Sequence, residues 1–174
     1  MASWSAIRLV LIAALINAWT TRQIDFVLAY TQADVECELY MSIPKGFEVE
    51  GSDDAQVLNL RKNLFGQRQA GRVWNQHLVK AFKSIGFKVS KIDESVFYRE
   101  GCIFVLYTDD SILAGPDPAV LDKVIQDMKE AGLNLTVEGD ITDFLGVQIN
   151  RTEDGAFLLN QPHLIADILK ELRL

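Results

Sequence analysis

The sequence contains few of the residues that build disulfide frameworks, zinc sites or nucleophilic catalytic groups. It has only two cysteines and two histidines in 174 residues. Cys37 and Cys102 lie far apart and fit neither a disulfide framework nor a zinc pattern, so we interpret them as reduced thiols of an intracellular protein. No serine–histidine–acid or cysteine–histidine arrangement and no phosphate-binding glycine loop is evident.

A hydrophobic run long enough to span a membrane is also lacking. The stretch from Ala6 to Trp19 carries Arg8 and is shorter than the ~20 residues that a spanning helix needs. It does not fit a signal peptide, because its charge lies inside the run and no small-residue cleavage site follows. We predict a buried amphipathic helix capped by Ser3 or Ser5, in a protein of the cytoplasm or nucleus that is neither secreted nor bound to a membrane.

Basic residues are in the minority, and the net charge of −7 argues at first against a nucleic-acid partner. The segment from Leu60 to Ile92, however, contains eight lysines and arginines and no acidic residue, while the other nine basic residues share the rest of the chain with all 24 acidic ones. This block is either a local electrostatic surface or a solvated helix face, and charge alone does not separate the two.

Helix and strand signals alternate along the chain. Helical periodicity occurs at about Ser5–Asn17, Gly71–Ile85, Pro118–Ala131 and Pro162–Leu172. Strand-like runs occur at Gln23–Leu28, Ser95–Arg99, Cys102–Tyr107, Ser111–Ala114, Phe144–Ile149 and Ala156–Leu159. This order predicts an α+β fold, a mainly antiparallel sheet with helices packed on one face, as a single domain over residues 1–174.

Three aspartates interrupt apolar strands, where an unpaired ionised carboxylate is costly. Asp25 lies in the first strand and, taken alone, is most simply a paired structural residue. Asp109 and Asp110 follow the apolar run that ends at Tyr107. Because neighbouring residues of a strand point to opposite faces, both acids reach one site only at a turn, so we place them at a hairpin tip. A solvated turn would explain the pair as well, but not its apolar flanks.

The three carboxylates suit hard-cation chemistry. Two like charges ~4 Å apart repel by about 4 kcal/mol at an effective dielectric of ~20, and a divalent cation removes this penalty. Magnesium prefers oxygen ligands, and two such ions can stabilise both oxygens of an in-line phosphoryl displacement. Asp25, Asp109 and Asp110 are therefore candidate metal ligands and catalytic residues.

Five ordered blocks of the sequence resemble those of copia-type reverse transcriptases. They are Gln23–Tyr30 with Glu38–Met41 and Ile43–Phe47, then Leu60–Trp74, Asp93–Phe97, Tyr107–Asp110 and Phe144–Ile149. The fourth matches the Tyr-x-Asp-Asp signature of the family. The resemblance implies a polymerase palm-like fold with partial fingers, and an RNA-directed DNA polymerase that adds dNTPs to a primer 3′ end by two-metal transfer.

The resemblance also implies residue roles. Asp25 and Asp109 would bind both Mg²⁺ or Mn²⁺ ions, Asp110 would complete the site, and Tyr30 would be an aromatic gate against the ribose 2′-hydroxyl. Residues near the incoming nucleotide or template would be Phe26, Tyr30, Phe65, Gly66 and Arg68. Residues in contact with the primer or another part of the nucleic acid would be Tyr107, Arg72, Lys80, Lys83, Phe144, Leu145 and Gly146. The implied partners are an RNA or DNA template with its primer, dNTPs, and further polyprotein domains or a second copy.

The chain departs from the family pattern at several positions. Tyr30–Ala33 replaces a phenylalanine-leucine-x-glycine sequence, Gly71 stands in place of a proline, and Thr108 in place of the more usual valine. We also expect the N-terminal fingers strands and the C-terminal thumb, connection and ribonuclease H parts to be absent.

Two functional hypotheses remain open. The intact aspartates favour a polymerase, whereas the acidic balance and the expected missing parts favour a domesticated or remnant fragment that binds nucleic acid or protein without catalysis. A palm enzyme of the cyclase kind is a third possibility. The block Phe144–Ile149 argues against it, because this block resembles the primer-grip hairpin of reverse transcriptases, which positions the primer 3′ end.

Overall fold

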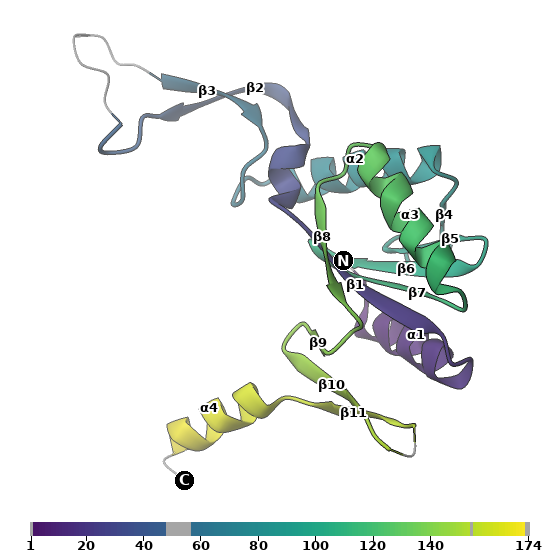
Figure 1. Cartoon of the computed structure of the whole chain (residues 1–174). Coiled ribbons are helices and arrows are strands. Elements are labelled where there is room, and N and C mark those ends of the chain that lie inside the picture. Colours follow the sequence, from purple (N-terminus) through teal and green to yellow (C-terminus); the bar gives the residue numbers. More distant parts are fainter. Residues whose placement is uncertain (1, 48–56, 154, 173–174) are drawn as a thin grey trace.

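An antiparallel sheet of six strands forms the centre of the computed structural model, which describes residues 2–47, 57–153 and 155–172 (Figure 1). In spatial order its strands are β4 (Lys88–Val89), β5 (Val96–Arg99), β6 (Cys102–Tyr107), β7 (Asp110–Gly115), β1 (Thr20–Phe26) and β8 (Leu135–Gly139). The expected hairpin of β5 and β6 and the expected antiparallel sheet are confirmed. Strand β1 comes from the N-terminal part of the chain but lies between β7 and β8.

The four expected helices are present, with ends that agree with the prediction to within a residue. They are α1 (Trp4–Ile16), α2 (Ala70–Ser84), α3 (Pro118–Glu130) and α4 (Pro162–Leu172), and a 3₁₀ helix, η1 (Ala29–Gln32), follows β1. The Ser3 hydroxyl caps α1 by accepting a hydrogen bond from the Ala6 N–H at 3.1 Å. Asp117 caps α3 in the same way, with Pro118 in the first turn. In the part of the chain that the structure describes, no helix is both long enough and apolar enough to cross a bilayer.

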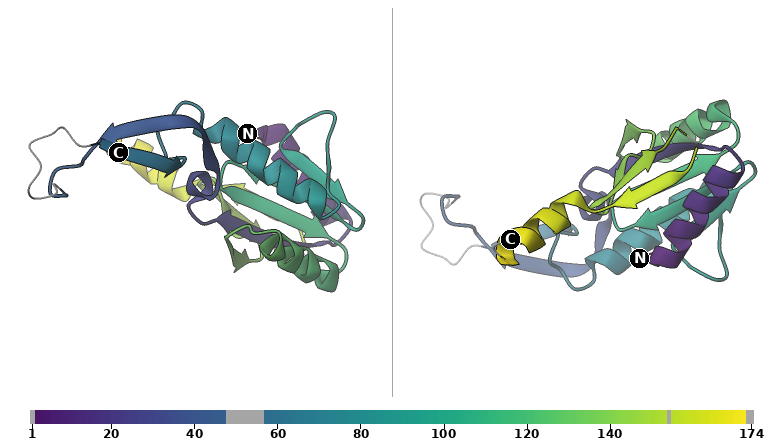
Figure 2. Two further views of the ribbon diagram at one scale, coloured as in Figure 1. Left: turned by 90° about the horizontal axis from the view of Figure 1, so that it is seen from above. Right: turned by 90° about the horizontal axis from the view of Figure 1, so that it is seen from below.

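Both faces of the sheet are apolar, because the residues of β6 and β7 alternate between two hydrophobic cores. Phe104 and Leu113 pack with α2 and α3 on one face, whereas Val105 and Ile112 pack with α1 on the other. The views from above and below show these two layers (Figure 2). The expectation of helices on one face therefore describes α2 and α3, and the structure adds α1 as a cover for the opposite face.

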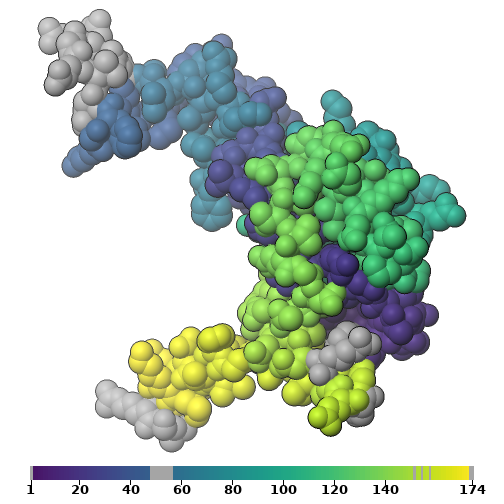
Figure 3. Space-filling view, viewed as in Figure 1, coloured from purple at the N-terminus to yellow at the C-terminus, as the bar shows by residue number. Residues whose placement is uncertain are grey.

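Two smaller sheets extend from the central one. An arm made of β2 (Asp34–Ser42) and β3 (Val57–Lys62) projects beyond α2, and β9 (Asp143–Phe144), β10 (Val147–Arg151) and β11 (Phe157–Asn160) form a second sheet that leads to α4. The space-filling view shows the molecule hollowed on one side, between this arm and α4 (Figure 3).

The apolar pattern at Phe144–Ile149 predicted a single strand, which is wrong because the chain reverses within it; a hairpin agrees with the resemblance of this block to the family's primer-grip hairpin. Leu145 and Gly146 both have positive φ, 53° and 72°, and they form a two-residue turn between β9 and β10. Two consecutive residues with positive φ are typical of tight hairpin turns, whose twist matches that of the flanking strands. A leucine gives no sequence signal for such a turn.

Candidate active site

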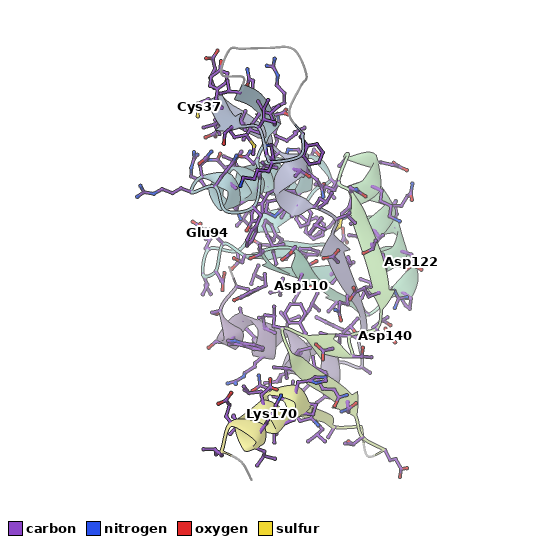
Figure 4. All side chains as sticks on the ribbon, turned by 90° about the vertical axis from the view of Figure 1, so that its left-hand side faces the viewer. Cys37, Glu94, Asp110, Asp122, Asp140 and Lys170 are labelled. Atoms are coloured by element: carbon purple, nitrogen blue, oxygen red, sulfur yellow. The ribbon has the colours of Figure 1, made fainter. Side chains whose placement is uncertain are left out.

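Asp25 and Asp110 face each other across two paired strands. In the antiparallel register of β1 and β7, Asp25 is the partner of Asp110, so their side chains leave the sheet on the same face. Asp110 also pairs with Tyr107 across a two-residue turn of Thr108 and Asp109. The predicted hairpin tip is thus present, and we call residues 107–110 the aspartate turn. In Figure 4, Asp110 lies between the arm, which carries Cys37, and α4, which carries Lys170.

The aspartate turn is held by hydrogen bonds from two other elements. The Trp74 indole Nε1–H of α2 donates to the Thr108 carbonyl at 2.9 Å. The Phe26 N–H at the end of β1 donates to the Asp109 carbonyl at 3.1 Å. The turn is therefore tied both to α2 and to the strand that carries Asp25.

Burial and mutual repulsion raise the pKa of two of the three aspartates. Partial burial raises the pKa of Asp25 above the ordinary 3.8, and the nearby charge of Asp109 raises it further. Burial likewise raises the pKa of Asp110, followed by the charges of Asp109, Asp25, Glu138 and Asp143. These shifts mark a site whose negative charges are close enough to repel one another.

Glu138 and Asp143 are acidic neighbours of the site that sequence reasoning missed. Glu138 lies on β8 and accepts a hydrogen bond at 2.6 Å from the side-chain amide of Gln23, which is two residues before Asp25 in β1. Asp143 begins β9. Nothing in the sequence indicates that β8 pairs with β1, so no local signal could have joined these two acids to the aspartates.

The donor set fits a hard divalent cation, although the side chains are not closed around one position. Carboxylate oxygens are the ligands that magnesium and manganese prefer. Within the described residues, no group of three histidine, cysteine, aspartate or glutamate side chains is gathered tightly enough to hold a metal ion. The paired strands bring Asp25 beside Asp110, and Asp109 is the next residue in the chain, so rotations of the side chains could bring these oxygens to a shared ion.

Of the residues expected near a nucleotide, Tyr30 lines a cavity that also reaches Thr108 of the aspartate turn, and Phe65 lies against Tyr30. Tyr30 is in η1, and its ring centroid is 6.0 Å from that of Phe65, a side chain that is 89% exposed. Gly66 follows with φ of 91°, and Arg68 is exposed. A cavity of about 780 Å³ is lined by Tyr30, Arg72, Glu94 and Thr108 among others, so it opens beside both Tyr30 and the turn.

Two expected contact residues are buried in the cores. Phe26 is 1% exposed and packs edge-on against Trp74, with ring centroids 5.3 Å apart, on the face opposite Asp25. Its side chain thus supports the site from beneath. Phe144 is also 1% exposed, and Leu145 is partly buried against the same core, so in the turn of the β9–β10 hairpin the exposed residue is Gly146.

The basic face of α2 is partly neutralised. Arg72 forms an ion pair with Glu36 of the arm, and Lys62 of the arm pairs with Asp34 at 2.8 Å. Lys80 and Lys83 are exposed and line a shallow groove on the outer side of α2. The tyrosine ring of the turn, Tyr107, is half-buried against the core on the α1 side.

A family model described as "Reverse transcriptase (RNA-dependent DNA polymerase)" matches residues 1–174, the whole length of the sequence. The chain belongs to this reverse transcriptase family. The family assignment agrees with the ordered sequence blocks and with the position of the aspartate turn between β6 and β7.

Relatives of this reverse transcriptase chain are found in retrotransposons. It is 31% identical to the Retrovirus-related Pol polyprotein from transposon RE1 of Arabidopsis thaliana over 169 residues, which is 95% of this chain and 11% of that protein. It is 28% identical to the corresponding polyprotein from transposon TNT 1-94 of Nicotiana tabacum, over 98% of this chain and 13% of that protein. The chain therefore spans about a tenth of the length of these plant relatives.

A solved structure of telomerase from Candida albicans, in complex with a fragment of telomeric RNA, shares the fold. Its TM-score is 0.52 at 13% sequence identity, over 92% of this chain and 34% of that chain. At this identity the likeness concerns the fold alone, which is the mixed helix and antiparallel sheet arrangement of a reverse transcriptase.

Proposed function

We propose that the chain is a single palm-like domain of a copia-type RNA-directed DNA polymerase that adds deoxynucleotides to a primer 3′ end. The observation that carries this proposal is the register of β1 and β7, in which Asp25 is paired with Asp110 beside the turn that bears Asp109. Family membership supports the polymerase class of the reaction.

In the proposed reaction, Asp25 and Asp109 would hold two Mg²⁺ or Mn²⁺ ions, and Asp110 would complete the set of ligands. When bound, such ions stabilise the attacking 3′ oxygen of the primer and the oxygen of the leaving pyrophosphate. The protein contributes the backbone register that places the three aspartates next to one another. Burial and the neighbouring acids make the unbound aspartates costly, which favours the binding of cations.

We further propose that Tyr30 closes one side of the nucleotide site. Its ring lies between α2 and the exposed ring of Phe65, where a 2′-hydroxyl on the incoming sugar would meet it. Phe65, Gly66 and Arg68 would then lie along the base and phosphates of the nucleotide, and the N–H of Phe26 would act only indirectly, through its bond to Asp109.

The proposed nucleic-acid surface runs from the aspartate turn in two directions. Tyr107 and the β9–β10 hairpin, with Leu145 and Gly146 at its tip and Phe144 in the core beneath, would position the primer end. Arg72, Lys80 and Lys83 on α2 would contact template phosphates, which provides register without sequence preference. Further polyprotein domains, as the names of the relatives suggest, would complete the grip on the duplex.

A second candidate is a module that binds nucleic acid or protein without polymerising. The observation that favours it is the pairing of Arg72 with Glu36, because this ion pair removes one cation from the proposed phosphate-binding face. The net charge of −7 acts in the same direction.

Primer extension with Mg²⁺ or Mn²⁺ separates the two candidates. The polymerase proposal predicts extension by the wild-type chain, no extension by the double variant Asp109→Asn and Asp110→Asn, and unchanged extension by Glu100→Gln, a control at the β5–β6 turn. Extension that survives the double substitution would overturn the assignment of these aspartates. Nucleic-acid binding without any extension would favour the second candidate.

A further inference from the structure

We propose that Trp74 is a positioning residue for the aspartate turn: its indole N–H holds the Thr108 carbonyl and thereby fixes the direction in which Asp109 points. The inference rests on the proposed function, because it assigns a role to Trp74 through Asp109. Trp74 itself is not a metal ligand and is 2% exposed, so it acts from the core beneath the turn.

The hydrogen bond from Trp74 is well placed for this role. A buried indole N–H needs an acceptor, and the acceptor here is a turn carbonyl 2.9 Å away, not a group of its own helix. The ring is fixed on both sides, stacked on His77 with centroids 6.0 Å apart and edge-on to Phe26 at 5.3 Å. The donor therefore has little freedom to move away from the turn.

Thr108 is the residue of the turn that most needs support. Its φ is 61°, in the left-handed region that β-branched residues rarely adopt. Such a conformation persists only where the surroundings hold it. The peptide that follows Thr108 is the one that Trp74 grips, and it leads directly into Asp109, so a rotation of this peptide would swing the carboxylate away from Asp25.

Trp74 also connects β1, which carries Asp25, with the aspartate turn. Its ring packs against Phe26, which follows Asp25 in β1, and the Phe26 N–H donates to the Asp109 carbonyl. One side chain of α2 thus contacts both the residue after Asp25 and the residue before Asp109. This arrangement would keep the aspartates in register with each other.

The direct test replaces Trp74 by benzothienylalanine, which has nearly the size and shape of tryptophan but carries sulfur in place of the N–H. We expect the dissociation constant for Mn²⁺ to rise by about tenfold and kcat for primer extension to fall by about tenfold, as is typical when a group that orients metal ligands is lost. We expect KM for the nucleotide to change much less, because the residues proposed to contact it are untouched.

The matched control carries the same replacement at Trp19, a half-buried ring that packs against the other core. There we expect Mn²⁺ affinity and kcat to stay within about twofold of the wild type, since outer partners of ligands, not distant groups, tune a metal site. A replacement at Trp74 that leaves both quantities within the same twofold, in a folded protein, would overturn the proposal.

Backbone amide exchange keeps this test separate from the proposed function. In the chain without metal, loss of the Trp74 N–H should accelerate hydrogen exchange of the Phe26 amide, which donates to the Asp109 carbonyl, while β5 amides stay protected. If the wild type neither binds Mn²⁺ nor extends primers, the polymerase proposal fails, but this measurement still decides the role of Trp74. Unchanged exchange of the Phe26 amide would then refute that role.

Discussion

Electrostatic repulsion at Asp25 and Asp110 raises the free energy of the folded chain. The two residues are paired across neighbouring strands, and the acidic residues Asp109, Glu138 and Asp143 lie nearby. Both pKa values are raised in the folded chain. A raised carboxyl pKa means that the folded state binds protons more tightly than the unfolded state. The penalty on folding is therefore present at neutral pH and disappears as the pH falls through the raised pKa values toward 3.8 and below.

Substitution of Asp110 by asparagine should therefore stabilise the chain while it abolishes extension. Without metal at pH 7, we expect the free energy of unfolding to rise by about 0.5–1 kcal/mol, a value already reduced for screening by solvent. The gain should vanish near pH 3, where the wild-type carboxyl groups are protonated. Urea unfolding at both pH values measures it.

The control for this substitution is Asp127→Asn. Asp127 pairs with Arg99 at 2.6 Å in a partly buried salt bridge between α3 and β5, so its loss should lower stability at pH 7. If Asp110→Asn destabilised the chain at pH 7 as Asp127→Asn does, the repulsion inferred at the site would be absent.

At the residue scale, the sequence was sufficient to predict the position of a site residue where its neighbours in space are also close in the chain. Asp109 and Asp110 could be placed at a turn because both flanking strands are local and apolar. Asp25 was a candidate because a carboxylate interrupts its apolar strand, but its pairing with Asp110 depends on β1 lying beside β7, which the strand pattern alone does not predict. Glu138 and the Arg72–Glu36 ion pair could not be predicted, since both depend on contacts between segments far apart in sequence.

At the element scale, strands were predicted where burial produces a pattern and missed where it does not. The arm strands β2 and β3 are mostly exposed, so they lack the apolar runs that identify β6 and β7. Strand β8 has a single buried residue, Leu135, and was missed for the same reason. The helices were predicted well because α2 and α3 alternate buried and polar positions with the period of a helix.

Gly115, at the end of β7, should tolerate no larger residue. A Cβ atom there would clash with the Gly101 carbonyl oxygen of the neighbouring turn and would lie 3.0 Å from Leu121 of α3. We expect Gly115→Ala to lower the free energy of unfolding by about 1–3 kcal/mol, as overpacking does in closely packed regions.

Gly71→Ala is the matched control for that substitution. The nearest atom to its added Cβ, Tyr30 Cε1, is 4.0 Å away, which is ordinary van der Waals contact. Gly71 is the second residue of α2, and alanine has a higher helix propensity than glycine, so no loss of stability and at most a small gain is expected there. Equal losses of stability at both positions, measured by urea unfolding, would show that the packing around β7 is not as described.

At the scale of the whole molecule, helices of similar length contribute very differently to stability. Helix α1 buries Ile7, Val10, Leu11 and Ala14 against the sheet, whereas no residue of α4 is buried. The sequence does not reveal this difference, because both segments show an apolar helical pattern. For a similar reason, the prediction placed the helices on a single face of the sheet. The face that a helix covers depends on tertiary packing, which its own apolar pattern does not indicate.

Removal of the chain after Asn160 should therefore leave the fold intact. We expect Tm to change by less than about 3 °C, in line with changes at exposed positions. Removal of residues 1–17 should abolish cooperative unfolding, because each buried aliphatic side chain contributes about 1.5–3 kcal/mol. Circular dichroism melts of both truncations test this contrast, and a large loss of Tm on removal of α4 would contradict it.

The most direct measurement is a count of bound Mn²⁺ ions by electron paramagnetic resonance, with primer–template and dNTP present. The wild-type chain should bind two ions per chain at saturation, and the variant Asp25→Asn with Asp109→Asn should bind neither of them. If the wild type and this double variant bind the same number of ions with the same affinity, Asp25 and Asp109 do not form a metal site.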